Sequence, residues 1–212
     1  MSSKRTNLES HIISVAKQLF IEKGYVATSM GDIAQQAGVT RPSLHYYFST
    51  KESMFQAVFG SIVGSLLPRS EEILSRPIPI MERLELIVGE YLELFKSNPS
   101  LPQFLCGEIR RNADHLVEEA KLCRLDEFGE IIRLYLGQEM AAGNIRTVPI
   151  HIVFMSIYSS LTFPFLAREL LVHLFLEGNQ ARFEPFLQEW KLYIMDSLRA
   201  LLCKDAPGAA AC

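Results

Sequence analysis

Side chains that bind phosphates and nucleobases are concentrated between residues 28 and 51 of the chain. An arginine donates two parallel hydrogen bonds to O6 and N7 of guanine. Lysines, hydroxyl groups and the amides at helix N-termini bind backbone phosphates. The residues of this segment that we assign to contact with DNA are Thr28, Ser29, Thr40, Arg41, Pro42, Ser43, His45, Tyr47 and Lys51.

Two short helices joined by a glycine turn are predicted to position these side chains. Ser29-Met30-Gly31-Asp32 has the pattern of a capping box and predicts the start of one helix, which Gly38 ends. Arg41-Pro42 predicts the start of the next helix, because a proline in the first turn loses no hydrogen bond. Another capping box, Thr6-Asn7-Leu8-Glu9, predicts an earlier helix that ends at Gly24. The segment therefore has the pattern of a helix-turn-helix, whose second helix enters the major groove.

The spacing of apolar residues separates an inner face from an outer face. The residues predicted to be buried are Ile33, Ala34, Ala37, Val39, Leu44 and Phe48, and Tyr46 is also assigned to packing. On the outer face, Arg41 is predicted to contact either a guanine or a phosphate. Thr40 is either a DNA contact or only the N-cap of its helix, and Ser43 is predicted to touch a base or a phosphate.

The remaining polar residues of the segment are assigned to the groove and to the phosphates beside it. His45 is predicted to point into the groove, and Tyr47 and Lys51 are predicted to anchor phosphates. Thr28 and Ser29 offer hydroxyl groups and helix N-terminal amides to a further phosphate.

This pattern resembles the DNA-binding domain of the TetR family of bacterial transcriptional regulators over roughly residues 8–58. The residues that carry the resemblance are Ala16, Leu19, Phe20, Gly24, Tyr25, Thr28, Ser29, Met30, Asp32, Ile33, Ala34, Ala37, Gly38, Val39, Leu44, Tyr46, Tyr47, Phe48, Lys51, Glu52 and Phe55. His45 stands where the family usually has tyrosine, which affects the operator sequence and not the mode of binding. The resemblance implies an all-helical homodimer that binds a palindromic double-stranded DNA operator, with repression as the default. It also implies an effector-binding and dimerisation domain beyond about residue 70.

Helix signals recur along the rest of the chain, so the fold class is predicted to be all-α with about nine helices. One helix is expected from residue 51 to 67, where Pro68 stops it; the others span 80–97, 101–111, 115–142, 149–176 and 180–203. The predicted organisation is a helix-turn-helix domain at 1–50, a connecting helix at 51–70, an effector and dimerisation domain at 71–204, and a disordered tail at 205–212.

Charge and cysteine usage point to a reducing compartment and to a small DNA-binding part. The net charge is −3, but residues 1–60 carry six lysines and arginines against four acidic residues, so the positive excess lies there. The four cysteines lie far apart without paired spacing, and no apolar signal region opens the chain, so we expect a cytoplasmic protein. Residues 147–167 lack charged side chains, but their prolines and hydroxyl residues favour a helix buried in a helical body over a membrane span.

The resemblance places a dimer interface and an effector pocket in the body. Candidates for the interface are Phe163, Phe165, Leu166, Phe186, Trp190 and Ile194, of which we expect about half to contact the partner and the others to be monomer core. Pro164 is expected to kink the helix that carries Phe163 and Phe165, or alternatively is only a local packing feature. Candidates for the lining of a pocket for a small hydrophobic effector are Tyr91, Phe95, Phe104, Cys106, Phe128, Phe154, Met155 and Tyr158. Each pocket candidate is alternatively a core residue, and Glu90, Glu93 and Glu108 are alternatively counter-charges for a cationic compound or solvated surface.

Three other kinds of protein are alternatives to this interpretation. An enzyme is disfavoured, because no phosphate loop, zinc spacing or nucleophile motif occurs, so we assign no catalytic residue, metal or cofactor. A DNA-binding dimer controlled by a protein partner is barely separated from the effector hypothesis by the sequence. A thiol sensor would need an accessible, thiolate-like Cys106 or Cys123.

Overall fold

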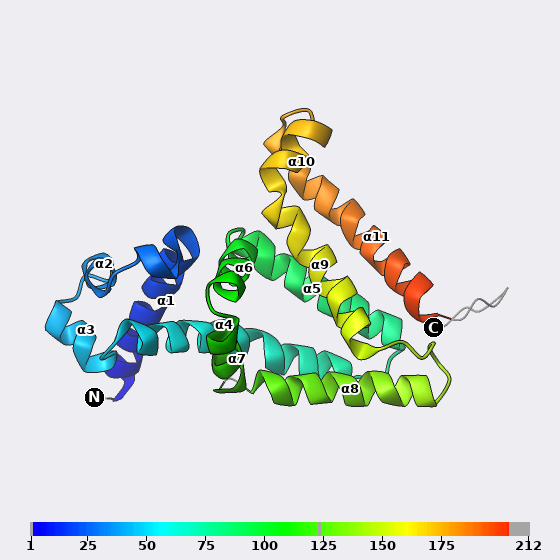
Figure 1. Cartoon of the computed structure of the whole chain (residues 1–212), viewed down its shortest axis with the longest axis horizontal. Helices are drawn as coiled ribbons and strands as arrows, with labels where there is room; N and C mark the ends of the chain where they lie inside the picture. The colour runs from blue at the N-terminus through cyan, green and yellow to red at the C-terminus, as the bar shows by residue number, and fades with distance from the viewer. Residues whose placement is uncertain (1, 123, 204–212) are drawn as a thin grey trace. The chain divides into compact units, whose positions relative to one another are not determined.

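All the secondary structure in the described residues is helical (Figure 1). The computed structural model describes residues 2–122 and 124–203; the side chains of residues 2–6, 63, 65, 66, 115, 125 and 128 lie outside that description. The helices are α1 (Ser2–Ala27), α2 (Met30–Gln36), α3 (Arg41–Tyr47), α4 (Lys51–Leu74), α5 (Ile80–Ser97), α6 (Leu101–Arg111), α7 (Ala113–Leu122), α8 (Leu125–Ala141), α9 (Ile150–Leu166), α10 (Arg168–Phe175) and α11 (Phe183–Leu202), with a short 3-10 helix at Gln180–Arg182 before the last.

The all-α class is confirmed, but the described residues contain eleven α-helices where about nine were predicted. The predicted helix 115–142 is divided between α7 and α8, where Arg124 adopts the left-handed conformation with a φ of 60°. The predicted helix 149–176 is divided into α9 and α10, which are bent by 70°. Ala167, between the two, departs from helical geometry with a φ of −97° and a ψ of 14°. Neither break carries a glycine at the turning residue, so the sequence pattern did not reveal it.

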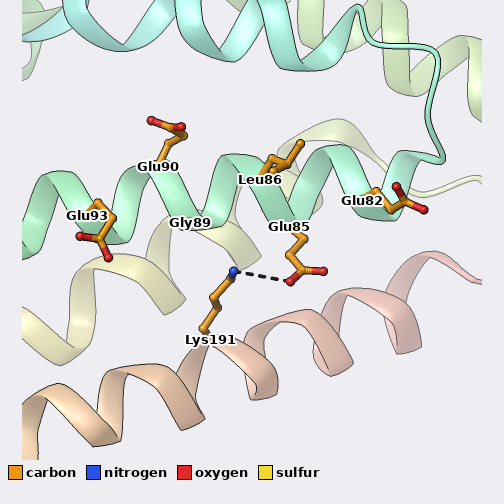
Figure 2. A pocket seen from close by; sticks show the side chains of 7 residues that line it. All are labelled: Glu82, Glu85, Leu86, Gly89, Glu90, Glu93 and Lys191. Carbon is orange, nitrogen blue, oxygen red and sulfur yellow. Dashed lines mark ion pairs between the residues drawn. The ribbon is translucent and has the colours of Figure 1, made fainter.

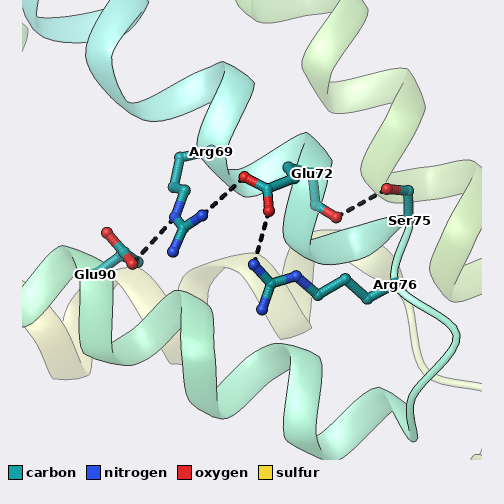
Figure 3. Close-up of polar contacts among 5 residues, drawn as sticks. All are labelled: Arg69, Glu72, Ser75, Arg76 and Glu90. Carbon is teal, nitrogen blue, oxygen red and sulfur yellow. Dashed lines mark hydrogen bonds and ion pairs between the residues drawn. The ribbon is translucent and has the colours of Figure 1, made fainter.

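Two helices also differ from the prediction at their ends. Helix α1 begins at Ser2, four residues before the predicted capping box, and its geometry breaks as expected at Gly24, which has a φ of 82°. Helix α4 continues through Pro68 to Leu74. Ile73 and Leu74 are buried, and their burial stabilises the extra turns despite the missing N–H of the proline. Figure 3 shows the exposed ion pairs of these turns, in which Glu72 binds Arg69 and Arg76, and Arg69 also binds Glu90 of α5.

The chain divides into two compact units. The first unit contains residues up to 68 and residues 103–126; the second contains residues 69–102 and those from 127 onward. In the second unit, α5, α9 and α11 contact one another, and α10 follows α9 (Figure 1). The predicted domain boundaries at residues 50, 70 and 204 remain predictions, and the predicted tail at 205–212 lies outside the described residues.

No single helix in the described ranges is both long and apolar enough to cross a membrane. Helices α9 and α10 pass that test of length and composition only when they are taken together across their 70° bend.

Candidate nucleic-acid interface

Helix α2 begins at a complete capping box. The Ser29 hydroxyl accepts a hydrogen bond from the Asp32 amide at 3.1 Å, and Asp32 Oδ2 accepts from both the amide (2.9 Å) and the hydroxyl (2.7 Å) of Ser29. These hydrogen bonds from Ser29 hold the pKa of Asp32 below its ordinary value, with smaller help from the charges of Lys23 and Arg41. The predicted start of the helix is therefore confirmed, and Ser29 serves first as its N-cap.

A four-residue connection, residues 37–40, joins α2 to α3. Gly38 has a φ of 68°, a conformation that only glycine adopts without strain, and the Val39 amide donates to Ala34 O at 3.0 Å. Thr40 is the N-cap of α3 and accepts a hydrogen bond from the Ser43 amide at 3.3 Å, while Pro42 lies in the first turn. Of the two roles predicted for Thr40, the cap is therefore present.

The buried face of the two short helices agrees with the prediction. Ile33, Ala34 and Ala37 of α2 and the following turn are buried, as are Leu44 and Phe48 at α3, while Val39 is half-buried. Arg41, Pro42 and His45 are exposed, whereas Ser43 and Tyr47 are half-buried. One side of α3 is therefore exposed and free to enter the major groove of DNA.

Arg41 and His45 are each held by a neighbour within this unit. The Arg41 guanidinium lies against Gly31, where an added Cβ would overlap its Nη2 and lie 3.1 Å from its Cζ. The His45 Nδ1 lies 3.2 Å from the carbonyl oxygen of Ser49, so Nδ1 donates and Nε2 faces outward as the remaining ring nitrogen. Both side chains keep hydrogen-bonding groups for a base edge.

Two residues lie elsewhere than predicted. Thr28 is only 1% exposed, and its hydroxyl donates to the carbonyl oxygens of Gly24 (2.9 Å) and Leu19 (3.2 Å). Thr28 thus ties the end of α1 to the start of α2, and we withdraw it as a phosphate contact.

Tyr46 was assigned to packing but is 67% exposed, with its ring 5.3 Å from that of Tyr47. A tyrosine has enough apolar surface to suggest burial, and only its position on the short helix places it outside.

Lys51 is held inside the first unit by α1. Its Nζ donates to the carbonyl oxygen of Val26 at 3.2 Å and lies 4.3 Å from the centre of the Tyr25 ring. Burial lowers the pKa of Lys51, and the charge of Arg111 lowers it further. Sequence reasoning missed the part played by Arg111, whose contact with this site depends on α6 and left no local signal.

Residues 12–58, which include α2, the turn and α3, match the family described as bacterial regulatory proteins, tetR family. This segment therefore belongs to the TetR family. The repressor KstR2 of Rhodococcus jostii is 27% identical over 137 residues, which cover 64% of this chain and 65% of that protein. The fatty acid metabolism regulator protein of Bacillus subtilis is 28% identical over 101 residues, which cover 48% of this chain and 52% of that one.

The solved structures agree in fold. The transcriptional regulator FadR from Bacillus subtilis, in complex with stearoyl-CoA, superposes with a TM-score of 0.66 at 22% identity and covers 76% of this chain and 88% of its own. At this identity the likeness shows the TetR fold alone. The matched relatives are regulators of transcription or metabolism and not enzymes, in agreement with the prediction from the sequence.

The residues predicted to line an effector pocket are divided between the two units of the chain. Phe95 is a core residue whose ring lies 5.6 Å from Phe165, whereas Phe154 and Met155 are exposed. Phe104 and Cys106 belong to the first unit; Tyr91, Phe95, Phe154, Met155 and Tyr158 belong to the second, and the side chain of Phe128 lies outside the description. Burial raises the pKa of Tyr91, which is hydrogen-bonded to Ser70. For these residues the pocket remains a prediction.

A different hollow lies between α5 and α11. Its volume is about 410 Å³, and it is lined by Glu82, Glu85, Leu86, Gly89, Glu90, Glu93 and Lys191 (Figure 2). Lys191 reaches toward Glu85, with 3.5 Å between Nζ and Oε1, while Glu90 pairs with Arg69 and Glu93 with Lys96. The hollow is acidic and its carboxylates are largely paired within the chain, so it does not have the apolar lining expected for a hydrophobic effector. In the described residues, no group of three or more His, Cys, Asp or Glu side chains is placed to hold a metal ion.

The predicted dimer residues separate into two groups. Phe163 and Leu166 are exposed, and Phe186 and Trp190 are half-buried. Phe165 and Ile194 are buried within the chain, and the Phe165 ring lies 5.6 Å from that of Phe95 of α5, so these two residues fit the alternative of a place in the monomer core.

Pro164 accounts for the position of Trp190. Because proline has no N–H, the carbonyl oxygen of Ser160 lacks its usual helical donor. The Trp190 indole supplies the missing hydrogen bond at 2.8 Å. Helix α9 therefore continues through Pro164, and the predicted bend lies three residues later, at Ala167.

Further large apolar side chains are exposed on α9, α10 and α11, and the sequence did not predict their exposure. They are Ile152, Phe154 and Met155 of α9, Leu170, Leu174 and Phe175 of α10, and Leu192 and Tyr193 of α11. The strongly apolar α9 is thus buried on one side only within the chain.

Proposed function

We propose that this chain is a cytoplasmic transcriptional repressor that binds a palindromic operator as a homodimer and is released by a small hydrophobic effector. The observation that carries the proposal is the capped α2–turn–α3 unit, which holds Arg41, Pro42 and His45 on one exposed side of a seven-residue helix. A recognition helix needs that geometry to enter the major groove.

In this proposal, base reading and phosphate binding fall to different residues. Arg41 and His45 read base edges from the exposed side of α3. Ser29, Thr40, Ser43, Tyr47 and Lys51 bind phosphates and fix the orientation of the helix on the duplex. Tyr46, which is exposed, joins this second group.

The apolar side chains exposed on α9 and α11 support the proposal that the partner is a second copy of this chain. Phe163 and Leu166 of α9 and Leu192 and Tyr193 of α11 are each more than two-fifths exposed on neighbouring helices. Large apolar side chains exposed on neighbouring helices are typical of homodimer interfaces.

The relatives suggest a long-chain acyl-CoA as the first effector to test. One relative is named a fatty acid metabolism regulator, and a structure with the same fold was solved with stearoyl-CoA. We expect stearoyl-CoA, but not free coenzyme A, to release the operator. A tenfold loss of DNA affinity requires the effector to discriminate between two conformations by only about 1.4 kcal/mol.

A dimer controlled by a protein partner is the second candidate. It is favoured by the exposure of Phe154 and Met155, which the effector hypothesis places inside a pocket. If no acyl-CoA or other small hydrophobic compound releases the operator, this candidate replaces the first.

The experiment that tests DNA reading is selection of bound sequences from a random duplex pool at fixed salt. We expect wild type to select a palindrome, Arg41→Ala to relax one position in each half-site, and Lys51→Ala to weaken all sequences alike. Arg133→Ala, which removes an exposed arginine from α8, is the matched control and should change neither property. If wild type enriches no sequence at any salt concentration, the proposal fails.

A further inference from the structure

Four charged side chains from two helices of the first unit surround one aromatic ring from a third helix. Tyr25 of α1 is the ring; Lys51 and Glu52 come from α4, and Glu108 and Arg111 come from α6. Only Lys51 among them was assigned to DNA, and the cluster joins the helix-turn-helix to a helix far along the chain.

The Tyr25 ring is fixed by both its edge and its hydroxyl group. The hydroxyl donates a hydrogen bond to Glu52 Oε2 at 2.7 Å, and the ring meets Phe55 edge-on at 5.3 Å. Burial, together with Glu52, raises the pKa of Tyr25 to about 12, so the phenol keeps its proton and remains a donor.

Two cations contact this ring. Lys51 Nζ and Arg111 Cζ each lie 4.3 Å from its centre, well within the range of a cation–π interaction. Two neighbouring positive charges repel each other, so carboxylates must hold them in place. Arg111 Nε donates to Glu108 Oε2 at 2.7 Å, and Glu108 is only 5% exposed. The guanidinium is therefore oriented by a buried carboxylate against the ring.

We infer that Arg111 is a positioning residue for DNA binding: it acts through Tyr25 and Lys51 to fix the corner between α1 and α2. The inference rests on the proposed operator binding. Tyr25 follows directly after the break at Gly24, and the N-cap of α2, Ser29, lies four residues later. The ring thus sets where α2 begins, and with it the direction of α3.

The test compares Arg111→Ala and Arg111→Lys with Arg110→Ala in the full-length protein on the selected operator. Arg110 is the neighbouring, exposed arginine of α6 and is the matched control. We expect Arg111→Ala to weaken operator binding about two- to fivefold, the order of effect that loss of a partly exposed cation–ring contact produces. Arg111→Lys should recover part of the affinity, because a lysine keeps the cation but not the planar fork. Arg110→Ala should bind as wild type does.

Two further measurements separate positioning from direct contact and from general destabilisation. Replacing a residue that itself binds phosphate reduces the dependence of operator affinity on salt concentration by about one unit of log–log slope. Arg111→Ala should instead leave this slope and the non-specific binding of DNA unchanged. Incorporated 3-fluorotyrosine, with its Tyr25 resonance assigned through Tyr25→Phe, should show a shifted ¹⁹F signal in Arg111→Ala but not in Arg110→Ala.

The outcomes distinguish this inference from the proposed function. If wild type selects an operator and Arg111→Ala binds it with unchanged affinity, the inference is wrong while the proposed function stands. A reduced salt slope in Arg111→Ala, or an unmoved Tyr25 resonance, also overturns it. If wild type selects no operator, the proposed function itself fails.

Discussion

The two short helices of the DNA-binding unit and the two long helices of the body begin in different ways. Helices α2 and α3 have seven residues each and begin at side-chain caps, Ser29 and Thr40. Helices α5 and α9, with 18 and 17 residues, follow Pro79 and Pro149 and have no side-chain cap. Isolated helices shorter than roughly 12–15 residues are marginal in water, so the short pair depends on caps and on the core beneath them. The long pair depends on burial along its length.

The largest effect in this comparison is expected from the aromatic core of the unit that contains the short helices. Phe55 is fully buried, and its ring contacts those of Phe20, Tyr25, Phe59 and Phe104. Phe55→Ala should lower the free energy of unfolding by about 3–5 kcal/mol, because it removes apolar contacts and leaves a cavity. Denaturant unfolding followed by circular dichroism measures it. An unchanged midpoint would show that the short helices do not need this core.

The next effect tests a long-range polar contact in the body. Arg83 donates to the carbonyl oxygens of Ile78 (2.8 Å) and Leu74 (3.2 Å) and to Glu139 Oε1 of α8 (2.9 Å). Arg83→Ala should cost about 2–3 kcal/mol, because it leaves a largely buried carboxylate with fewer partners. The double variant Arg83→Met, Glu139→Gln is the control and should be less destabilised. If the single variant unfolds at the same denaturant concentration as wild type, the body does not depend on this contact.

A smaller effect is expected from the cap of α2. Ser29→Ala removes the hydroxyl that accepts from the Asp32 amide and should lower the free energy of unfolding by about 1 kcal/mol. Operator affinity should fall with it, because α2 supports α3. Ser75→Ala, which removes an exposed hydroxyl at the end of α4, is the control. Equal stability of the two variants would contradict the dependence of short helices on caps.

The same cap gives a pH dependence whose sign is fixed by Asp32. Its pKa is lowered in the folded protein, so its contribution is fully present above the unfolded value of about 3.9. The contribution is lost as the pH falls through the lower, folded value. Unfolding of wild type and Asp32→Asn measured across this range should therefore differ near neutrality and converge in acid. A difference that persists at the acid end would assign the effect to something other than ionisation.

The smallest effect is expected at the exposed ion pairs of Figure 3. Glu72 pairs with Arg69 and Arg76, but each of the three side chains is at least a third exposed, so water and salt screen both pairs. Glu72→Gln should leave the unfolding midpoint within experimental error. A clear loss, abolished by 1 M salt, would show that the end of α4 depends on charge as well as on the burial of Ile73 and Leu74.

The accuracy of the predictions from the sequence also differs between the DNA-binding unit and the body. The helix-turn-helix was predicted with its caps, its turn and its buried face, because Ser29, Gly38 and Thr40 act within a few residues of their own position. The burial of Thr28 and the exposure of Tyr46 were missed, because each depends on how α1, α2 and α3 pack and not on residue type.

In the body, single helices such as α5 and α6 were predicted at their observed bounds, but long-range features were not. The bend at Ala167 and the left-handed Arg124 occur at residues that usually continue a helix. The contact of Trp190 with Ser160 and that of Arg111 with Tyr25 join residues far apart in the chain. Periodicity identifies the apolar side of each helix, but it does not say which part a neighbouring helix covers.

Gly31 has a consequence for how this protein could change its target. Its missing side chain leaves the space in which the Arg41 guanidinium lies. An alanine there would push the guanidinium outward without altering any residue of α3, since the arginine is flexible and the helix backbone is not. A substitution at Gly31, which lies outside α3, would then change the preferred operator sequence. Two related regulators with identical recognition helices would therefore not need to share their binding sites.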